Sequence, residues 1–113
     1  MSHFRSFEAE ALRLLGTATL GDTLVNAVIR DATFVGFKHS GVGYFLTVHH
    51  PQLPTARLVL SQPIVSGSVG DVFGSYLAFV GHNELTLEYA AVTDVPANIR
   101  DFEVQVHVQP NAT

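Results

Sequence analysis

The sequence predicts an α+β domain in which two N-terminal helices pack on a curved antiparallel sheet of about six strands. Apolar residues recur at helical spacing before Ala32, and at the strand period of two after it. The 113 residues suffice for one domain with its own core. We therefore expect a single domain over 1–113, with a helical part at about 3–30, an antiparallel meander at about 32–108 and a disordered tail at 109–113.

The first helix is predicted from about residue 3 to residue 15. Glu8, Glu10 and Arg13 fall away from its apolar stripe on the helical wheel, and Gly16 suits the position after its end. The stripe consists of Phe4, Phe7, Ala11, Leu14 and Leu15.

A second helix is our interpretation of residues 22–30. Asp22 is typical of an N-cap, and the apolar residues that follow have helical spacing. Several of them are β-branched, which favours a strand almost as well. The choice between helix and strand is therefore left open here.

A hairpin between Ala32 and His50 carries apolar residues on both faces. A turn at Ser40-Gly41-Val42 gives the pairs Phe34 with Val48, Gly36 with Leu46, Val35 with Thr47, and Phe37 with Phe45. An antiparallel sheet with one wet side would alternate apolar and polar residues, so we expect both faces to be covered. The helices supply one cover, and a second part of the same sheet or another molecule supplies the other. Which face meets the helices is not determined.

Two short strands are predicted next, at 57–61 and 64–68, with a bend or sheet edge at Pro63. A second hairpin then spans 76–89, because His82 and Asn83 tolerate the positive φ of a tight turn. Its core face pairs Val80 with Leu85, Ala78 with Leu87 and Tyr76 with Tyr89, and its other face pairs Phe79 with Thr86 and Leu77 with Glu88.

A loop at 92–101 leads to a last strand with one dry side, predicted from the alternation of apolar and polar residues over 102–108. Its dry side consists of Phe102, Val104, Val106 and Val108.

Composition excludes several classes of function. The net charge is −4 and the six basic residues are scattered, which argues against nucleic acid as a partner. The lack of cysteine rules out disulfides and thiolate metal sites. No signal peptide pattern or stretch of about 20 apolar residues occurs, so we expect a soluble, cytoplasmic protein with no membrane partner. Only 14% of residues are charged, which indicates self-association.

The search for catalytic chemistry gives no catalytic residue, cofactor or metal site. There is no HExxH motif, and adjacent His49 and His50 leave a strand on opposite faces. Glu88 stands among apolar neighbours on the less buried face of the second hairpin. In an alternative reading, Glu88, His49 and His50 line a pocket between the helices and the sheet.

Four apolar side chains are candidates for an interface. Phe37 and Phe45 are expected on one side of the first hairpin, and Leu77 and Phe79 on one side of the second. Aromatic side chains at such positions belong either to the core or to a surface that meets a partner.

The chain resembles a group of small uncharacterised bacterial proteins at three segments: Ser40-Gly41-Val42-Gly43-Tyr44-Phe45, Tyr76-Leu77-Ala78-Phe79 and Leu85-Thr86-Leu87-Glu88. Members carry a (T/S)GVG(F/Y)F hairpin followed by an LxLE-type strand. The likeness covers roughly residues 22–96. The chain departs from the pattern after Glu88, where many relatives continue with a segment rich in glycine and aromatic residues and this chain has Tyr89-Ala90-Ala91-Val92. The resemblance implies a cytoplasmic α+β domain without a known activity, and it transfers no functional residues.

Two hypotheses follow. The leading one is a non-catalytic protein-interaction domain, an accessory or immunity-type protein that binds a protein partner or itself as a homodimer. The alternative is a small-molecule-binding domain or modest hydrolase that uses the pocket described above.

Overall fold

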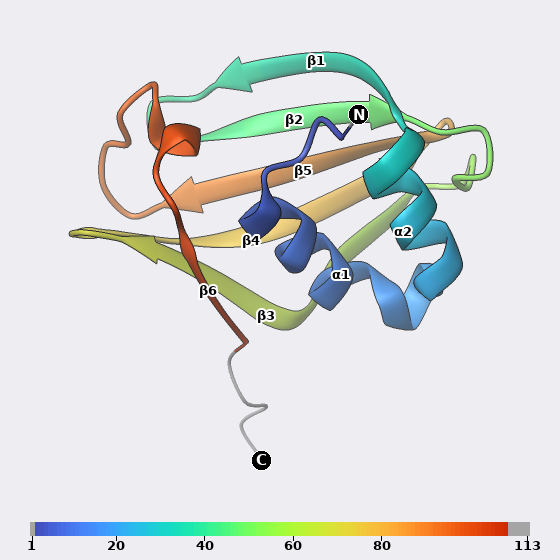
Figure 1. The fold of residues 1–113 in the computed structure, drawn as a ribbon, viewed down its shortest axis with the longest axis horizontal. Coiled ribbons are helices and arrows are strands. Elements are labelled where there is room, and N and C mark those ends of the chain that lie inside the picture. The colour runs from blue at the N-terminus through green and yellow to red at the C-terminus, as the bar shows by residue number, and fades with distance from the viewer. Residues whose placement is uncertain (1, 109–113) are drawn as a thin grey trace.

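The computed structural model describes residues 2–108, so the predicted tail at 109–113 lies outside the described residues. Two helices precede six strands that form a single antiparallel sheet (Figure 1). The elements are α1 (Ser6–Leu20), α2 (Asp22–Asp31), β1 (Thr33–His39), β2 (Gly43–His49), β3 (Leu58–Val69), β4 (Val72–Gly81), β5 (Glu84–Ala91), the short 3-10 helix η1 (Ile99–Asp101) and β6 (Gln105–Val108). The predicted α+β class is confirmed.

The strand order is β1-β2-β5-β4-β3-β6, which differs from a simple meander. After β2 the chain crosses to β3 and returns through β4 to β5, which pairs with β2 in the middle of the sheet. The C-terminal segment then crosses to the far edge, where β6 pairs with β3. Pairing of β2 with β5 joins the two predicted hairpins into one surface.

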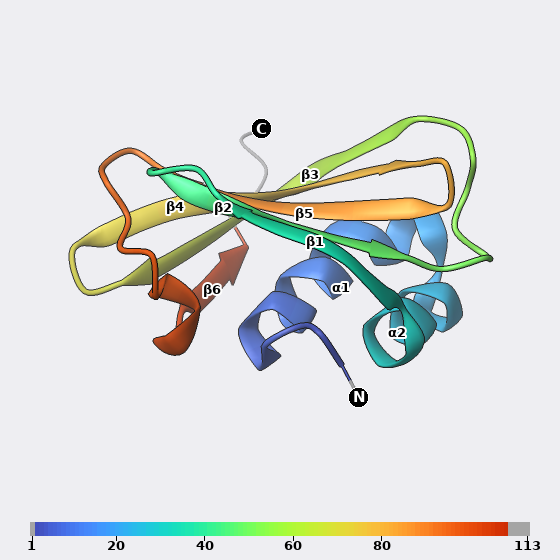
Figure 2. The same ribbon diagram turned by 90° about the horizontal axis from the view of Figure 1, so that it is seen from above.

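Both helices lie on the same side of the sheet (Figure 2). Helix α1 packs on α2 and on β3, β4 and β6. The buried side chains of the central strands, such as Leu46, Ala78 and Leu87, point toward the helices. Within residues 2–108 no element covers the opposite side, so the expectation that both faces of the first hairpin are shielded is wrong for this chain alone.

Helix α1 is longer than predicted. It continues through Gly16, which is buried against Val25 of α2, and ends only before Gly21, whose φ of +86° suits glycine. Residues 22–31 form a helix rather than the alternative strand, with Asp22 as its first residue and Gly21 as its N-cap.

The register of the first hairpin differs from the prediction after Phe34. Phe34 pairs with Val48 as expected, but the register then shifts at Val35, so that Phe37 pairs with Leu46 and Lys38 with Phe45. An extra residue in one strand moves every later side chain to the other face. Phe37 therefore lies on the helix side, and the predicted pairing of Phe37 with Phe45 on one side is wrong.

The second hairpin has the predicted register, with Tyr76 opposite Tyr89 and Phe79 opposite Thr86. His82 and Asn83 have φ values of 54° and 62°, as the turn requires. The two short strands predicted around Pro63 are one strand, β3, with an irregularity between Leu60 and Val65.

The last strand is shorter than predicted, since β6 begins at Gln105. Phe102 therefore precedes it and is exposed, whereas Val104 is buried.

A row of four aromatic rings crosses the helix side of the sheet. Phe37 stacks on Tyr44 at a centroid distance of 5.4 Å, Tyr44 on Tyr89 at 5.9 Å, and Tyr89 meets Tyr76 at 4.9 Å. Gly74 gives Tyr89 the space it needs: a Cβ at that position would lie 2.7 Å from the Tyr89 ring and 2.6 Å from the Ala90 carbonyl oxygen.

Gly74→Ala is expected to lower the free energy of unfolding by about 3 kcal/mol, because the added methyl group meets backbone as well as a ring. Urea denaturation measures the change. Gly36→Ala is the matched control, since a Cβ there meets nothing within 4 Å. Equal stability of the two variants would contradict the close approach of Gly74 and Tyr89.

Candidate functional site

The side of the sheet that faces away from the helices is called the outer face here. Its apolar side chains come from the three strands β2, β3 and β4: Phe45, Val59, Phe73, Leu77 and Phe79. Val59 is 61% exposed, Phe73 47% and Phe79 38%. Val59 and Phe79 are cross-strand partners, and Leu77 lies on the same side of β4. Val59, Leu77 and Phe79 therefore form an apolar patch on the uncovered side of the sheet, which Glu88 separates from Phe45 and Ser75 separates from Phe73.

Charged side chains of both signs lie within and beside this surface. Lys38 is opposite Phe45 on β1, and Glu88 lies on β5 between Phe45 and Leu77. Arg57 and Glu84 line a shallow groove beside Phe79. The outer face thus carries two basic and two acidic groups around its apolar residues.

The middle of the outer face is held by a polar cross-strand contact. The hydroxyl oxygens of Thr47 and Thr86 are 2.8 Å apart, between β2 and β5. Two grooves meet here, since Thr86 and Glu84 line both the groove that reaches Lys38 and the groove that reaches Arg57. The contact fixes the relative position of the two strands at the centre of the face.

The structure brings together three of the four predicted interface residues. Phe45, Leu77 and Phe79 lie on the outer face, with Glu88 paired between Phe45 and Leu77. Phe37 lies on the helix side, where its ring packs against Tyr44. The extra residue at Val35 separates it from the other three.

The residues of the predicted pocket do not meet beneath the helices. Glu88 and His49 lie on the outer face, where His49 is opposite Glu84. His50 follows β2, is buried, and accepts the N–H of Gln52 through Nδ1 at 3.2 Å. The pocket of the alternative hypothesis is therefore not formed by these three residues.

The space between helix and sheet holds instead a buried ionic cluster, formed by Glu8, Tyr44 and Arg100. The Glu8 side chain is fully buried and accepts two hydrogen bonds from the Arg100 guanidinium, both at 2.7 Å. It also accepts the Tyr44 hydroxyl at 2.5 Å and the Arg5 backbone N–H at 2.7 Å. Four donors therefore satisfy the two oxygens of this carboxylate.

The environment of this cluster fixes its protonation states. Burial, the Glu8 charge and the hydrogen bond to Glu8 raise the pKa of Tyr44 far above its ordinary value, so its hydroxyl remains a donor. Burial acts against the charge of Arg100, but its hydrogen bonds and attraction to Glu8 outweigh this, and the pKa of the guanidinium is raised. Tyr44 and Arg100 thus both act as hydrogen-bond donors to Glu8.

The cluster ties the C-terminal segment to the start of α1. Arg100 belongs to η1, and its guanidinium also donates to the His3 carbonyl oxygen at 2.8 Å and lies over the Phe37 ring, 5.3 Å from its centroid. Sequence reasoning missed Glu8 because the residue is charged. Its distance of four residues from both Phe4 and Leu12, which are buried, is the signal that places it on the buried side of the helix.

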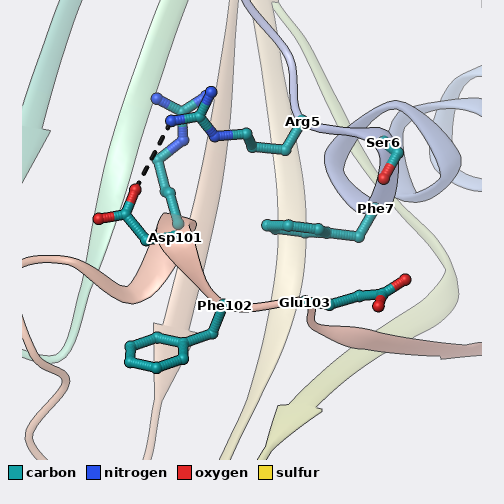
Figure 3. Close-up of a pocket in the computed structure, with 7 residues that line it drawn as sticks. Arg5, Ser6, Phe7, Asp101, Phe102 and Glu103 are labelled. Atoms are coloured by element: carbon teal, nitrogen blue, oxygen red, sulfur yellow. Dashed lines mark ion pairs between the residues drawn. The ribbon is translucent and has the colours of Figure 1, made fainter.

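A shallow groove lies beside the cluster, between the start of α1 and η1 (Figure 3). Phe7 and Phe102 line it, together with Arg5 and Asp101, whose side chains form an ion pair of 3.8 Å. Both partners of this pair are more than half exposed, so it contributes little to stability. The groove has charges of both signs, and among the residues drawn in Figure 3 the buried one is apolar Phe7.

Comparison with protein-family models, curated proteins and solved structures gives no match. The resemblance to small bacterial proteins therefore stays a prediction. Among residues 2–108 no helix has the length and apolar character needed to span a bilayer, and no His, Asp and Glu side chains gather into a metal-binding group.

Glu8→Gln is expected to lower the free energy of unfolding by about 3 kcal/mol, because it removes the partner of a largely buried guanidinium. The N–H₂ group of the new glutamine is itself a donor, and it would face the donors that now bind the Glu8 carboxylate. Urea denaturation measures the loss. Glu10→Gln, a neighbouring exposed residue of the same helix, is the control and should change stability little. If Glu8→Gln lowers the free energy of unfolding no more than Glu10→Gln does, the Glu8–Arg100 ion pair does not stabilise the position of the C-terminal segment.

Tyr76→Phe tests the buried tyrosines at alkaline pH. Within the described chain the Tyr76 hydroxyl is buried without a hydrogen-bond partner, and burial raises its pKa well above the ordinary value. A tyrosine of the unfolded chain ionises near pH 10, whereas the raised pKa keeps the Tyr76 hydroxyl protonated in the folded chain. The free energy of unfolding is therefore unaffected by this group below about pH 10 and falls as the pH rises further.

At pH 7 the Tyr76→Phe variant should therefore be as stable as the original chain or more so. Above pH 10 its unfolding free energy should fall less steeply, by up to about 1.4 kcal/mol per pH unit. Denaturation curves at a series of pH values give both results. An unchanged alkaline slope would mean that Tyr76 also ionises in the folded state.

Proposed function

We propose that this chain is a non-catalytic protein-interaction domain that binds its partner through the outer face. The supporting observation is the uncovered side of the sheet, where Val59, Phe73 and Phe79 are exposed on neighbouring strands. Contiguous exposed apolar surface on a folded domain is typical of an interaction site. On the helix side the middle of β2, β5 and β4 is filled by the helices and the core, where Leu46, Leu87 and Ala78 are fully buried.

The face is a better docking surface than the edge of the sheet. The edge strand β1 exposes apolar side chains, but it also has the bulge at Val35 and the charged Lys38. Bulges and lysines at sheet edges hinder pairing with another strand. Binding through side chains of the outer face meets no such obstacle.

Binding rather than catalysis fits the charged groups. The one fully buried carboxylate of the described residues, Glu8, is saturated by donors, and Glu88 and His49 lie on an open surface without a cleft that excludes water. An accessory or immunity-type protein acts by binding alone, and we place the domain in that class. The absence of cysteine fits a location in the cytoplasm, which is part of the same proposal.

The test is photo-crosslinking in living cells. p-Benzoylphenylalanine is introduced at Phe79 on the outer face and, as a matched control, at Phe102, an exposed phenylalanine near η1. We expect covalent adducts from position 79 and markedly fewer from position 102. Equal labelling from both positions, or no adduct from position 79, would refute binding through the outer face.

A further inference from the structure

We propose that the occupant of the outer face is a second copy of this chain, packed face to face as a two-fold symmetric dimer. This inference rests on the proposed function and adds the identity of the partner. Three properties of the outer face support it: its charge balance, its area and its shape.

The charge balance suits a surface that meets itself. In a two-fold dimer the same patch lies on both sides of the interface, so any excess of one sign would repel its copy. Lys38 and Arg57 balance Glu84 and Glu88 on the outer face. The whole chain has a net charge of −4, so its acidic excess lies elsewhere. A basic or acidic partner would favour an unbalanced face, whereas a second copy favours this one.

The area matches what a dimer requires. Five strands about 4.8 Å apart, with about eight residues each at about 3.3 Å per residue, form a face of roughly 24 by 26 Å. Two such faces bury roughly 1,200 Å² before side-chain relief is added, which is within the range of specific interfaces. The apolar residues Phe45, Leu77 and Phe79 lie inside this area, with Glu88 and Thr86 of β5 between β2 and β4.

The shape of the face permits close packing of sheets. Its side chains stand on regular antiparallel strands, and the register from β2 through β5 to β4 has no irregularity. Two such faces pack at about 10 Å as the two layers of a β-sandwich, with the inner side chains interdigitating. The dimer would then be a sandwich whose outer surfaces are both covered by helices.

The experiment uses two charge variants of the full chain. Lys38→Glu with Arg57→Glu makes all four flanking groups acidic, and Glu84→Lys with Glu88→Lys makes them all basic. Light scattering after size exclusion, over a wide dilution series, gives the mass of each. We expect a dimer for the original chain, a monomer for each variant alone, and a restored dimer when the two variants are mixed.

Arg13→Glu with Arg30→Glu is the control, because it changes the net charge equally on exposed helical positions away from the outer face. It should remain a dimer, and circular dichroism verifies that each variant is folded. Dimers from both charge variants alone, or monomers after mixing, would overturn the face-to-face arrangement.

A second measurement does not depend on charge reversal. The chain has no cysteine, so Thr86→Cys gives a single spin-label site at the centre of the outer face. We expect a short distance between the labels of two copies, and a much longer one for labels at Arg13→Cys on α1. A long distance from position 86 would overturn the proposal.

The outcomes separate this inference from the proposed function. If the original chain is a monomer at every concentration while position 79 crosslinks to a different protein, the dimer is refuted and the interaction domain stands. If position 79 gives no adduct in cells and the purified chain is a monomer, both fail. An adduct of twice the chain mass from position 79 supports both.

Discussion

The alternation of side chains along β2, β5 and β4 is the constraint on which the rest of this structure depends. Each strand sends one set of residues toward the helices and the next set away from them, so the same short segments must serve two surfaces. Of the residues that point toward the helices, Leu46, Leu87 and Ala78 are fully buried. Within residues 2–108 the two α-helices lie on one side of the sheet (Figure 2). Apolar residues in the other set, such as Phe79 and Phe73, therefore remain exposed.

The buried Glu8 cluster serves the covered side. Burial of a carboxylate is costly unless donors replace the lost water, and here Arg100, Tyr44 and the Arg5 backbone do so. The ion pair also ties η1 to the start of α1, and the C-terminal segment is further held by the Val95 N–H to the Gly41 carbonyl oxygen and by pairing of β6 with β3. A polar contact of this kind gives geometric specificity at the cost of desolvation. The aromatic row beside it supplies the apolar packing.

Local patterns in the sequence predicted local structure well, and contacts between distant segments less well. The 76–89 hairpin has the predicted register because two turn residues with positive φ determine it. The strand order could not be predicted, because the pairing of β2 with β5 depends on packing between segments far apart in the chain. Glu8 escaped notice because periodicity treats every charged residue as solvent-facing. Of the site, the outer-face positions Phe45, Leu77 and Phe79 were found, whereas Arg57 and Lys38 were not.

The bulge at Val35 links the sequence to the composition of the outer face. Without it, the expected register would place Phe37 beside Phe45 on the outer face and would turn Lys38 toward the helices. The extra residue exchanges them: Phe37 joins the aromatic row under Arg100, and Lys38 stands opposite Phe45. This exchange removes a buried lysine and supplies one of the two basic groups that balance Glu84 and Glu88. One inserted residue in an edge strand thus hinders pairing at the edge and completes a charge-balanced face suited to a second copy.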